Sequence, residues 1–147
     1  MLVRPEEVAH LVVPVPLPLV AVETQAIRVA AWMRSRFDDG TLDYIPDPPD
    51  CDRWCPPGVT LAQGGGDCDD LAILAVSLLA AGGIDADFVV GHYCSRFMCF
   101  GHAWVEGHDE QGWFLLEPTT GWLSRDARPA GYHASLLLRP GLCRIAA

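Results

Sequence analysis

The chain has 147 residues, of which 50% are hydrophobic and 20% are charged. This composition excludes a chain that is disordered throughout, and the length suits a single domain spanning residues 1–147. A formal net charge of −9, with only 10 Lys and Arg residues, argues against a nucleic-acid partner.

The N-terminal region, residues 1–43, is predicted to hold an extended segment and then a helix. Its longest apolar stretch, Leu11–Val22, is interrupted by prolines and falls short of the ~20 residues that a membrane-spanning helix needs. It is also a poor secretory signal, so we expect an extended segment, no membrane partner and a cytoplasmic protein. Apolar side chains at helical spacing then predict a helix over Glu23–Phe37.

A long loop and a buried helix follow. Thr41–Gly66 contains five prolines and no periodic pattern, which predicts a loop; a loop of this length is unusual unless it builds a site. The next segment, Cys68–Ala81, is predicted to be a helix, capped by Asp67 and ended by glycines. Because this helix is apolar on every face, we expect it to lie at the centre of the domain.

Alternating segments in the second half of the chain predict strands over Asp87–Tyr93, Phe100–Gly107 and Trp113–Glu117. Ser135–Leu138, in the C-terminal segment 120–147, suits either a strand or a short helix. A buried helix followed by an antiparallel sheet predicts an α+β fold.

Cys68 is a candidate nucleophile because it opens the buried helix. A helix N-terminus favours a thiolate and offers the Cys68 backbone N–H to an oxyanion. Asp67, Asp69 and Asp70 oppose the thiolate, so a cationic partner is required, and histidine is the expected one. Taken alone, Cys68 fits a buried structural cysteine better than a nucleophile.

His102 and Glu117 are the candidate partners of Cys68. His102 lies in a predicted strand, and Glu117 ends the next one, from where a carboxylate can orient and stabilise the imidazolium. Glu106 is the rival carboxylate on the strand of His102. It would lie roughly 13 Å along that strand, at ~3.3 Å per residue, so Glu117 is preferred.

These residues sit in motifs that resemble the transglutaminase-like superfamily, over about residues 44–119. The motifs are Gly66-Asp67-Cys68-Asp69-Asp70-Leu71-Ala72, Gly101-His102-Ala103-Trp104-Val105-Glu106, Gly112-Trp113 and Leu116-Glu117-Pro118-Thr119, with Tyr44-Ile45-Pro46-Asp47-Pro48 upstream. The resemblance implies a papain-like core, in which a buried central helix carrying the cysteine at its N-terminus packs on an antiparallel sheet. It also implies thiol acyl chemistry through Cys, His and Asp.

Carried over by position, Cys68 is the nucleophile, His102 the general base and acid, and Glu117 the orienting carboxylate. Family members usually have Asp where Glu117 stands, and the extra methylene shifts the carboxylate by about 1 Å. Gln63, placed as in papain, and the indole N–H of Trp54 are the candidates for a further oxyanion donor.

The expected function is hydrolysis of a peptide or amide bond, by a cysteine peptidase or deamidase, with a protein or peptide substrate and no cofactor. Two alternatives stay open: transglutaminase-type transfer to an amine, and an inactive binding or scaffold domain. The sequence does not indicate an oligomeric state.

Four further cysteines, Cys51, Cys55, Cys94 and Cys99, flank the candidate nucleophile in two close pairs. They can be unrelated free thiols, disulfides, or ligands of a structural metal, although the spacings exceed the tight C-x2-C knuckle. If the four meet, they tie the long loop to the turn before the His102 strand.

Overall fold

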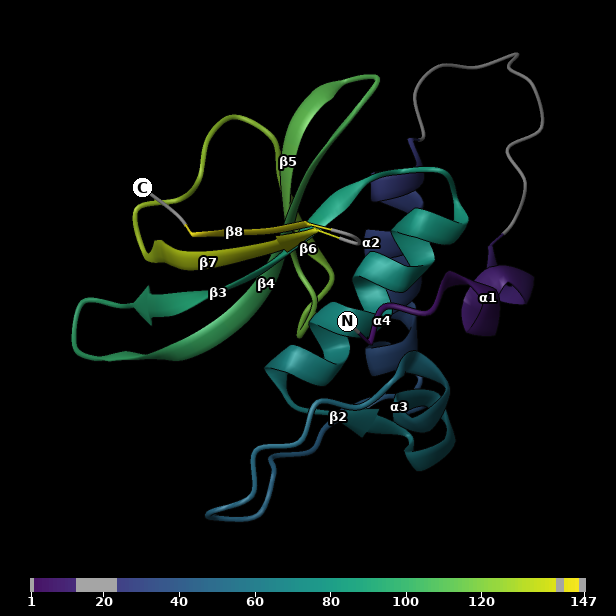
Figure 1. Cartoon of the computed structure of the whole chain (residues 1–147), viewed down its shortest axis with the longest axis horizontal. Coiled ribbons are helices and arrows are strands. Elements are labelled where there is room, and N and C mark those ends of the chain that lie inside the picture. The colour runs from purple at the N-terminus through teal and green to yellow at the C-terminus, as the bar shows by residue number, and fades with distance from the viewer. Residues whose placement is uncertain (1, 13–23, 140–141, 146–147) are drawn as a thin grey trace.

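The computed structural model describes residues 2–12, 24–139 and 142–145. Its helices gather on one side of a six-stranded sheet, and the hairpin of β3 and β4 extends away from them (Figure 1). This is the α+β architecture that the sequence predicts. The helices are α1 (Pro5–Val8), the 3-10 turn η1 (Ala9–Leu11), α2 (Gln25–Asp38), α3 (Pro57–Gln63) and α4 (Cys68–Ala81).

The sheet is antiparallel, in the order β6-β5-β4-β3-β7-β8. All three predicted strands form, each slightly longer than expected, and Ser135–Leu138 lies in a strand rather than a helix. The strands are β3 (Ala86–Cys94), β4 (Cys99–Asp109), β5 (Gly112–Glu117), β6 (Trp122–Ser124), β7 (Tyr132–Arg139) and β8 (Leu142–Ile145).

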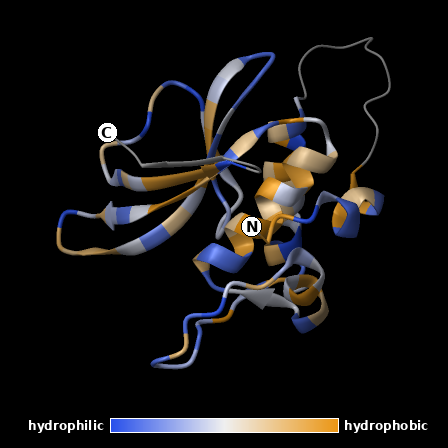
Figure 2. Ribbon diagram, in the orientation of Figure 1, coloured by the Kyte–Doolittle hydropathy of each residue, from blue (hydrophilic) through white to orange (hydrophobic). Residues whose placement is uncertain are grey.

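Helix α4 is the centre of the fold, with the bounds that the sequence predicts. It contacts β3 and β4 on one side and α1, α2 and α3 on the others, and its body is hydrophobic along most of its length (Figure 2). The prediction that Asp67 caps it is wrong in one respect. Asp67 occupies the cap position, but its side chain accepts no capping hydrogen bond.

Leu74→Asp should lower the free energy of unfolding by several kcal/mol. Leu74 is 0% exposed in the middle of α4, so the carboxylate would be buried without a partner. Urea denaturation measures this loss. An unchanged unfolding midpoint would show that α4 is not the core helix.

The segment Thr41–Gly66 is more ordered than the predicted loop. Pro57 starts α3 because proline is tolerated in the first helical turn, and Gly64, with φ of 79°, ends it in the left-handed conformation. Two-residue strands on either side, β1 (Asp43–Tyr44) and β2 (Gly65–Gly66), pair in parallel. This pairing ties the start of the loop to the turn that leads into α4.

The predicted extended segment Leu11–Val22 lies almost entirely outside the described residues; only Leu11 and Val12 fall within them, and Leu11 ends η1. The predicted helix at Glu23–Phe37 is confirmed as α2, which Thr24 caps by accepting from the Ile27 N–H at 3.4 Å. Within the part of the chain that the structure describes, each helix is too short or too polar to cross a membrane.

Candidate active site

Cys68 is the first residue of α4. The pairing of β1 with β2 fixes the backbone that leads into it. Ile45 N–H donates to the Gly66 carbonyl at 2.9 Å, and Asp43 N–H donates to the Gly64 carbonyl at 2.9 Å. Gly65 adopts φ of 146° there, and a Cβ at this position would lie 2.0 Å from the Asp43 carbonyl oxygen. Glycine is therefore required to bring the two strands together beneath Cys68.

His102 and Glu117 come together from neighbouring strands. His102 Nε2 lies 2.8 Å from Glu117 Oε2, and their side chains are only 11% and 8% exposed. The rival carboxylate is engaged elsewhere: Glu106 accepts from the Trp104 indole N–H at 2.7 Å and pairs with Arg128. Of the two carboxylates, it is Glu117 that meets the histidine.

The electrostatics at His102 favour a charged pair. Burial lowers the pKa of His102, but hydrogen bonds with Cys68 and Glu117, and the charges of both, raise it to about 9. Burial raises the pKa of Glu117, yet its hydrogen bond and charge interaction with His102 bring that pKa below the ordinary value. Near neutral pH, Glu117 is therefore a carboxylate and His102 an imidazolium beside Cys68.

Tyr44 is a third group at Cys68, and it is absent from the residues predicted for the site. Burial raises the pKa of the Tyr44 hydroxyl, as do the charges of Cys68, Asp67 and Asp69 and a hydrogen bond with the Cys68 side chain. Tyr44 pairs with Gly66 across β1 and β2, which brings it beside Cys68. The signal for it was the upstream motif that begins at Tyr44.

A pocket of ≈440 Å³ lies beside His102 and has mostly aromatic walls. Tyr93 and Phe100 pack against one another across the β3–β4 hairpin, with ring centroids 5.6 Å apart. The lining residues are Tyr44, Tyr93, Phe100, His102, Glu117, Thr119 and Tyr132.

Gln63 and Trp54, the two candidate oxyanion donors, each contact a residue elsewhere in the fold. Gln63 donates its side-chain amide to the Gly65 carbonyl at 2.8 Å, so this N–H is used within its own turn. Trp54 packs edge-on against Phe88 with ring centroids 5.0 Å apart. The oxyanion role of either residue stays a prediction.

The four flanking cysteines do not meet. Cys94 and Cys99 are cross-strand partners at the end of the β3–β4 hairpin and form a disulfide with each other, whereas Cys51 and Cys55 are free thiols. The idea that these cysteines tie the long loop to the hairpin is therefore wrong, because the nearest partner of each hairpin cysteine lies across its own turn.

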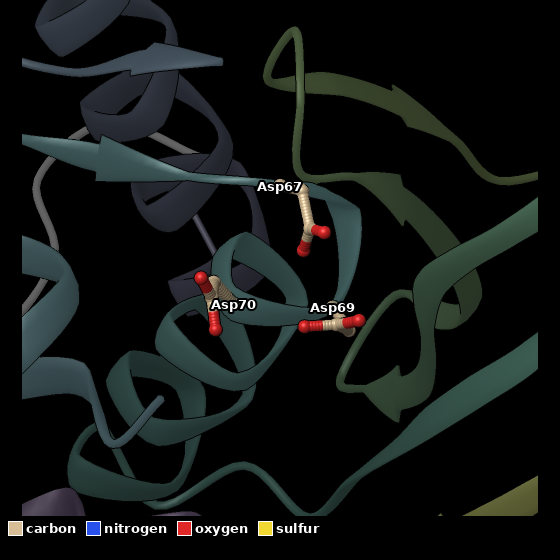
Figure 3. A group of neighbouring side chains, drawn as sticks. All are labelled: Asp67, Asp69 and Asp70. Carbon is tan, nitrogen blue, oxygen red and sulfur yellow. The ribbon is translucent and has the colours of Figure 1, made fainter. Parts of the chain in front are cut away.

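Three carboxylates lie close together at the N-terminal end of α4 (Figure 3). Asp67, Asp69 and Asp70 offer oxygens within 4.8 Å of one another, and Asp67 Oδ1 and Asp69 Oδ1 are buried without a hydrogen-bond partner. Asp70 Oδ1 accepts from the Cys55 N–H at 2.6 Å. Burial is the largest cause that raises the pKa of Asp69, followed by the charge of Asp67 and by the hydrogen bond that a protonated Asp69 would donate to Asp67, and together they bring this pKa to about 8.

Comparison with protein families places these residues in a known context. A family model described as the transglutaminase-like superfamily matches residues 18–118, which contain Cys68, His102 and Glu117. Among curated proteins, none matches the chain.

Solved structures share the fold at low sequence identity. LapG of Legionella pneumophila superposes with a TM-score of 0.66 in its EGTA-treated form, at 18% identity over 84% of this chain and 66% of LapG. Calcium-bound LapG gives 0.61, at 17% identity over 83% and 67%. A candidate cysteine protease of Cytophaga hutchinsonii gives 0.53, at 21% identity over 67% of this chain and 32% of that protein. The chain thus spans about two thirds of LapG.

Proposed function

This chain belongs to the transglutaminase-like superfamily, and from that membership we propose that it is a cysteine peptidase that cleaves peptide or amide bonds. The observation that carries the proposal is the short contact between His102 and Glu117, at 2.8 Å, on an imidazole that also interacts with Cys68. A nucleophile, a base and a group that orients the base are the three parts that thiol acyl chemistry requires.

In the proposed reaction, the Cys68 thiolate attacks the carbonyl carbon of the scissile bond. The oxyanion accepts a hydrogen bond from the Cys68 backbone N–H, and we assign the Tyr44 hydroxyl as a second donor. His102 gives its proton to the leaving amine, and a thioester forms on Cys68. Water then attacks the thioester as His102 takes a proton from it, which releases the acid and restores the thiolate.

Mass spectrometry of a peptide library, treated with wild-type protein or Cys68→Ala, tests this function. If the protein hydrolyses peptide bonds in the library, new peptide termini should appear with the wild type alone. Deamidation would appear as a small mass gain at glutamine or asparagine, and amine transfer as cross-linked peptides. Identical spectra for both proteins across the library would contradict the proposal and favour a scaffold domain.

We also propose that Asp67, Asp69 and Asp70 hold a calcium ion. A set of carboxylate oxygens suits this hard cation, and the two buried, unpartnered oxygens of Asp67 and Asp69 are the ones that a cation would satisfy. The calcium-bound form of LapG, which shares the fold, supports the same ion. When bound, calcium would neutralise negative charge beside Cys68.

At pH 9, above the raised pKa of about 8, Asp69 is ionised, and Asp69→Asn should raise the melting temperature in EGTA by roughly 3–5 °C because it removes one of three neighbouring like charges. Calcium should stabilise the wild type further, by about 2.7 kcal/mol of unfolding free energy at a calcium concentration one hundred times the dissociation constant. The variant should lose this stabilisation. Differential scanning fluorimetry with and without calcium measures both effects. Asp126→Asn, an equal charge change at an exposed site, is the control; a calcium response that survives in Asp69→Asn contradicts the site.

A further inference from the structure

Tyr132 contacts Glu117 from a part of the chain that lies beyond the matched residues 18–118. Its hydroxyl donates to Glu117 Oε2 at 2.8 Å, the oxygen that also meets His102 Nε2. Tyr132 is on β7, and β3 and β4 separate β7 from β5, which ends in Glu117. The hydrogen bond therefore bridges two intervening strands of the sheet.

Both oxygens of Glu117 are fully engaged. Oε2 accepts from His102 and Tyr132, while Oε1 accepts from the Thr119 backbone N–H at 3.1 Å and the Thr119 hydroxyl at 2.6 Å. Glutamate has one more rotatable bond than aspartate, so more contacts are needed to hold its carboxylate in one place. Four donors on a buried carboxylate define its position closely.

Tyr132 is itself held firmly. Its ring packs edge-on against Tyr93 and Trp104, with centroids 4.9 Å and 5.2 Å apart. Trp104 is fully buried and is anchored in turn by Glu106. Burial, with the charge of Glu117 and the hydrogen bond to it, raises the pKa of Tyr132, so the hydroxyl keeps its proton and stays a donor.

We propose that Tyr132 is a positioning residue that holds Glu117 against His102 and so allows a glutamate to serve where the family usually has an aspartate. The inference rests on the proposed peptidase function, because it assigns Glu117 the task of orienting the base. Tyr132 acts through Glu117 and does not itself take part in bond breaking.

The test is a double-mutant cycle of Tyr132→Phe and Glu117→Gln, with the rate of Cys68 alkylation by iodoacetamide at pH 6 as the readout. Peptide mass spectrometry separates Cys68 from Cys51 and Cys55. In the wild-type background, Tyr132→Phe should slow the alkylation by about tenfold, the scale of one hydrogen bond to a charged group. In the Glu117→Gln background it should cause no further loss.

A second readout is the downfield NMR signal of the proton between His102 Nε2 and Glu117. This signal should weaken or shift in Tyr132→Phe and persist in Tyr93→Phe, which removes a hydroxyl from the neighbouring ring. The melting temperature of each variant reports separately on folding.

Equal slowing by Tyr132→Phe in both backgrounds, or an unchanged NMR signal, would overturn the inference, because Tyr132 would then support the fold alone. If Glu117→Gln alkylates as fast as the wild type, the proposed catalytic function fails instead. The NMR signal still decides in that case whether Tyr132 holds Glu117 against His102.

Discussion

His102→Ala should lower the turnover of any peptide that the wild type cleaves by about 10⁶-fold, the loss seen when the base of a catalytic triad is removed. His102 is expected both to stabilise the Cys68 thiolate and to protonate the leaving amine, and no described neighbour of Cys68 can replace it in both tasks. Single-turnover assays on a peptide found in the library measure the loss. His133→Ala, an exposed histidine on β7, is the matched control.

The same variant should also change the pH dependence of stability. The pKa of His102 is raised from its ordinary 6.5 to about 9, so its charge stabilises the folded state fully below pH 6.5, and this contribution is lost as the pH rises through about 9. His102→Ala should therefore be more destabilising at pH 6 than at pH 10. Equal destabilisation at both values would contradict the charged pair.

Glu117→Gln should reduce turnover by about 10⁴-fold, because an amide cannot stabilise the imidazolium and can impose the wrong tautomer on His102. Burial raises the pKa of Glu117, but the hydrogen bond and charge interaction with His102 outweigh burial and lower this pKa below its ordinary 4.5, so the wild-type side chain is ionised near neutral pH. Steady-state kinetics of the pure variant, with its melting temperature, measure the effect separately from folding.

A second variant, Glu117→Asp, keeps the carboxylate and changes only its position. Although aspartate is the usual family residue, the shorter side chain should withdraw the carboxylate from His102 and Tyr132 and lower turnover by about 100-fold, the cost of a misplacement near 1 Å. Activity equal to or above the wild type would show that the position of the carboxylate does not depend on Tyr132.

The sequence predicts much of this fold because its strongest signals are local. The apolar run from Leu71 to Leu79 and the glycines after Ala81 define α4 without any knowledge of its neighbours. Helix α3 is not predicted from the sequence, because Pro56 and Pro57 suggest a loop. Proline is nevertheless tolerated at the start of a helix, where the backbone N–H that it lacks would have no intrahelical partner.

The site is only partly predictable, because some of its contacts join residues that lie far apart in the sequence. Cys68, His102 and Glu117 stand in recognisable motifs, but Tyr132 reaches Glu117 across two strands, and nothing in the residues around it signals that contact. Tyr44 likewise depends on the pairing of two-residue strands that no periodicity reveals. One amide N–H of Gln63 donates to the nearby Gly65 carbonyl, a contact that the spacing of Gln63 before Cys68 does not reveal.

The most direct test of the central claim compares the alkylation rates of Cys68 and Cys51 at pH 6 and pH 9, in the wild type and in His102→Ala. Cys51 is an exposed free thiol and serves as the reference within the same molecule. A cysteine paired with an imidazolium reacts quickly at pH 6, where ordinary thiols are almost entirely protonated. We predict that Cys68 reacts much faster than Cys51 at pH 6 and that His102→Ala removes this difference. Cys68 reacting no faster than Cys51 at pH 6, with no effect of His102→Ala, would contradict the account.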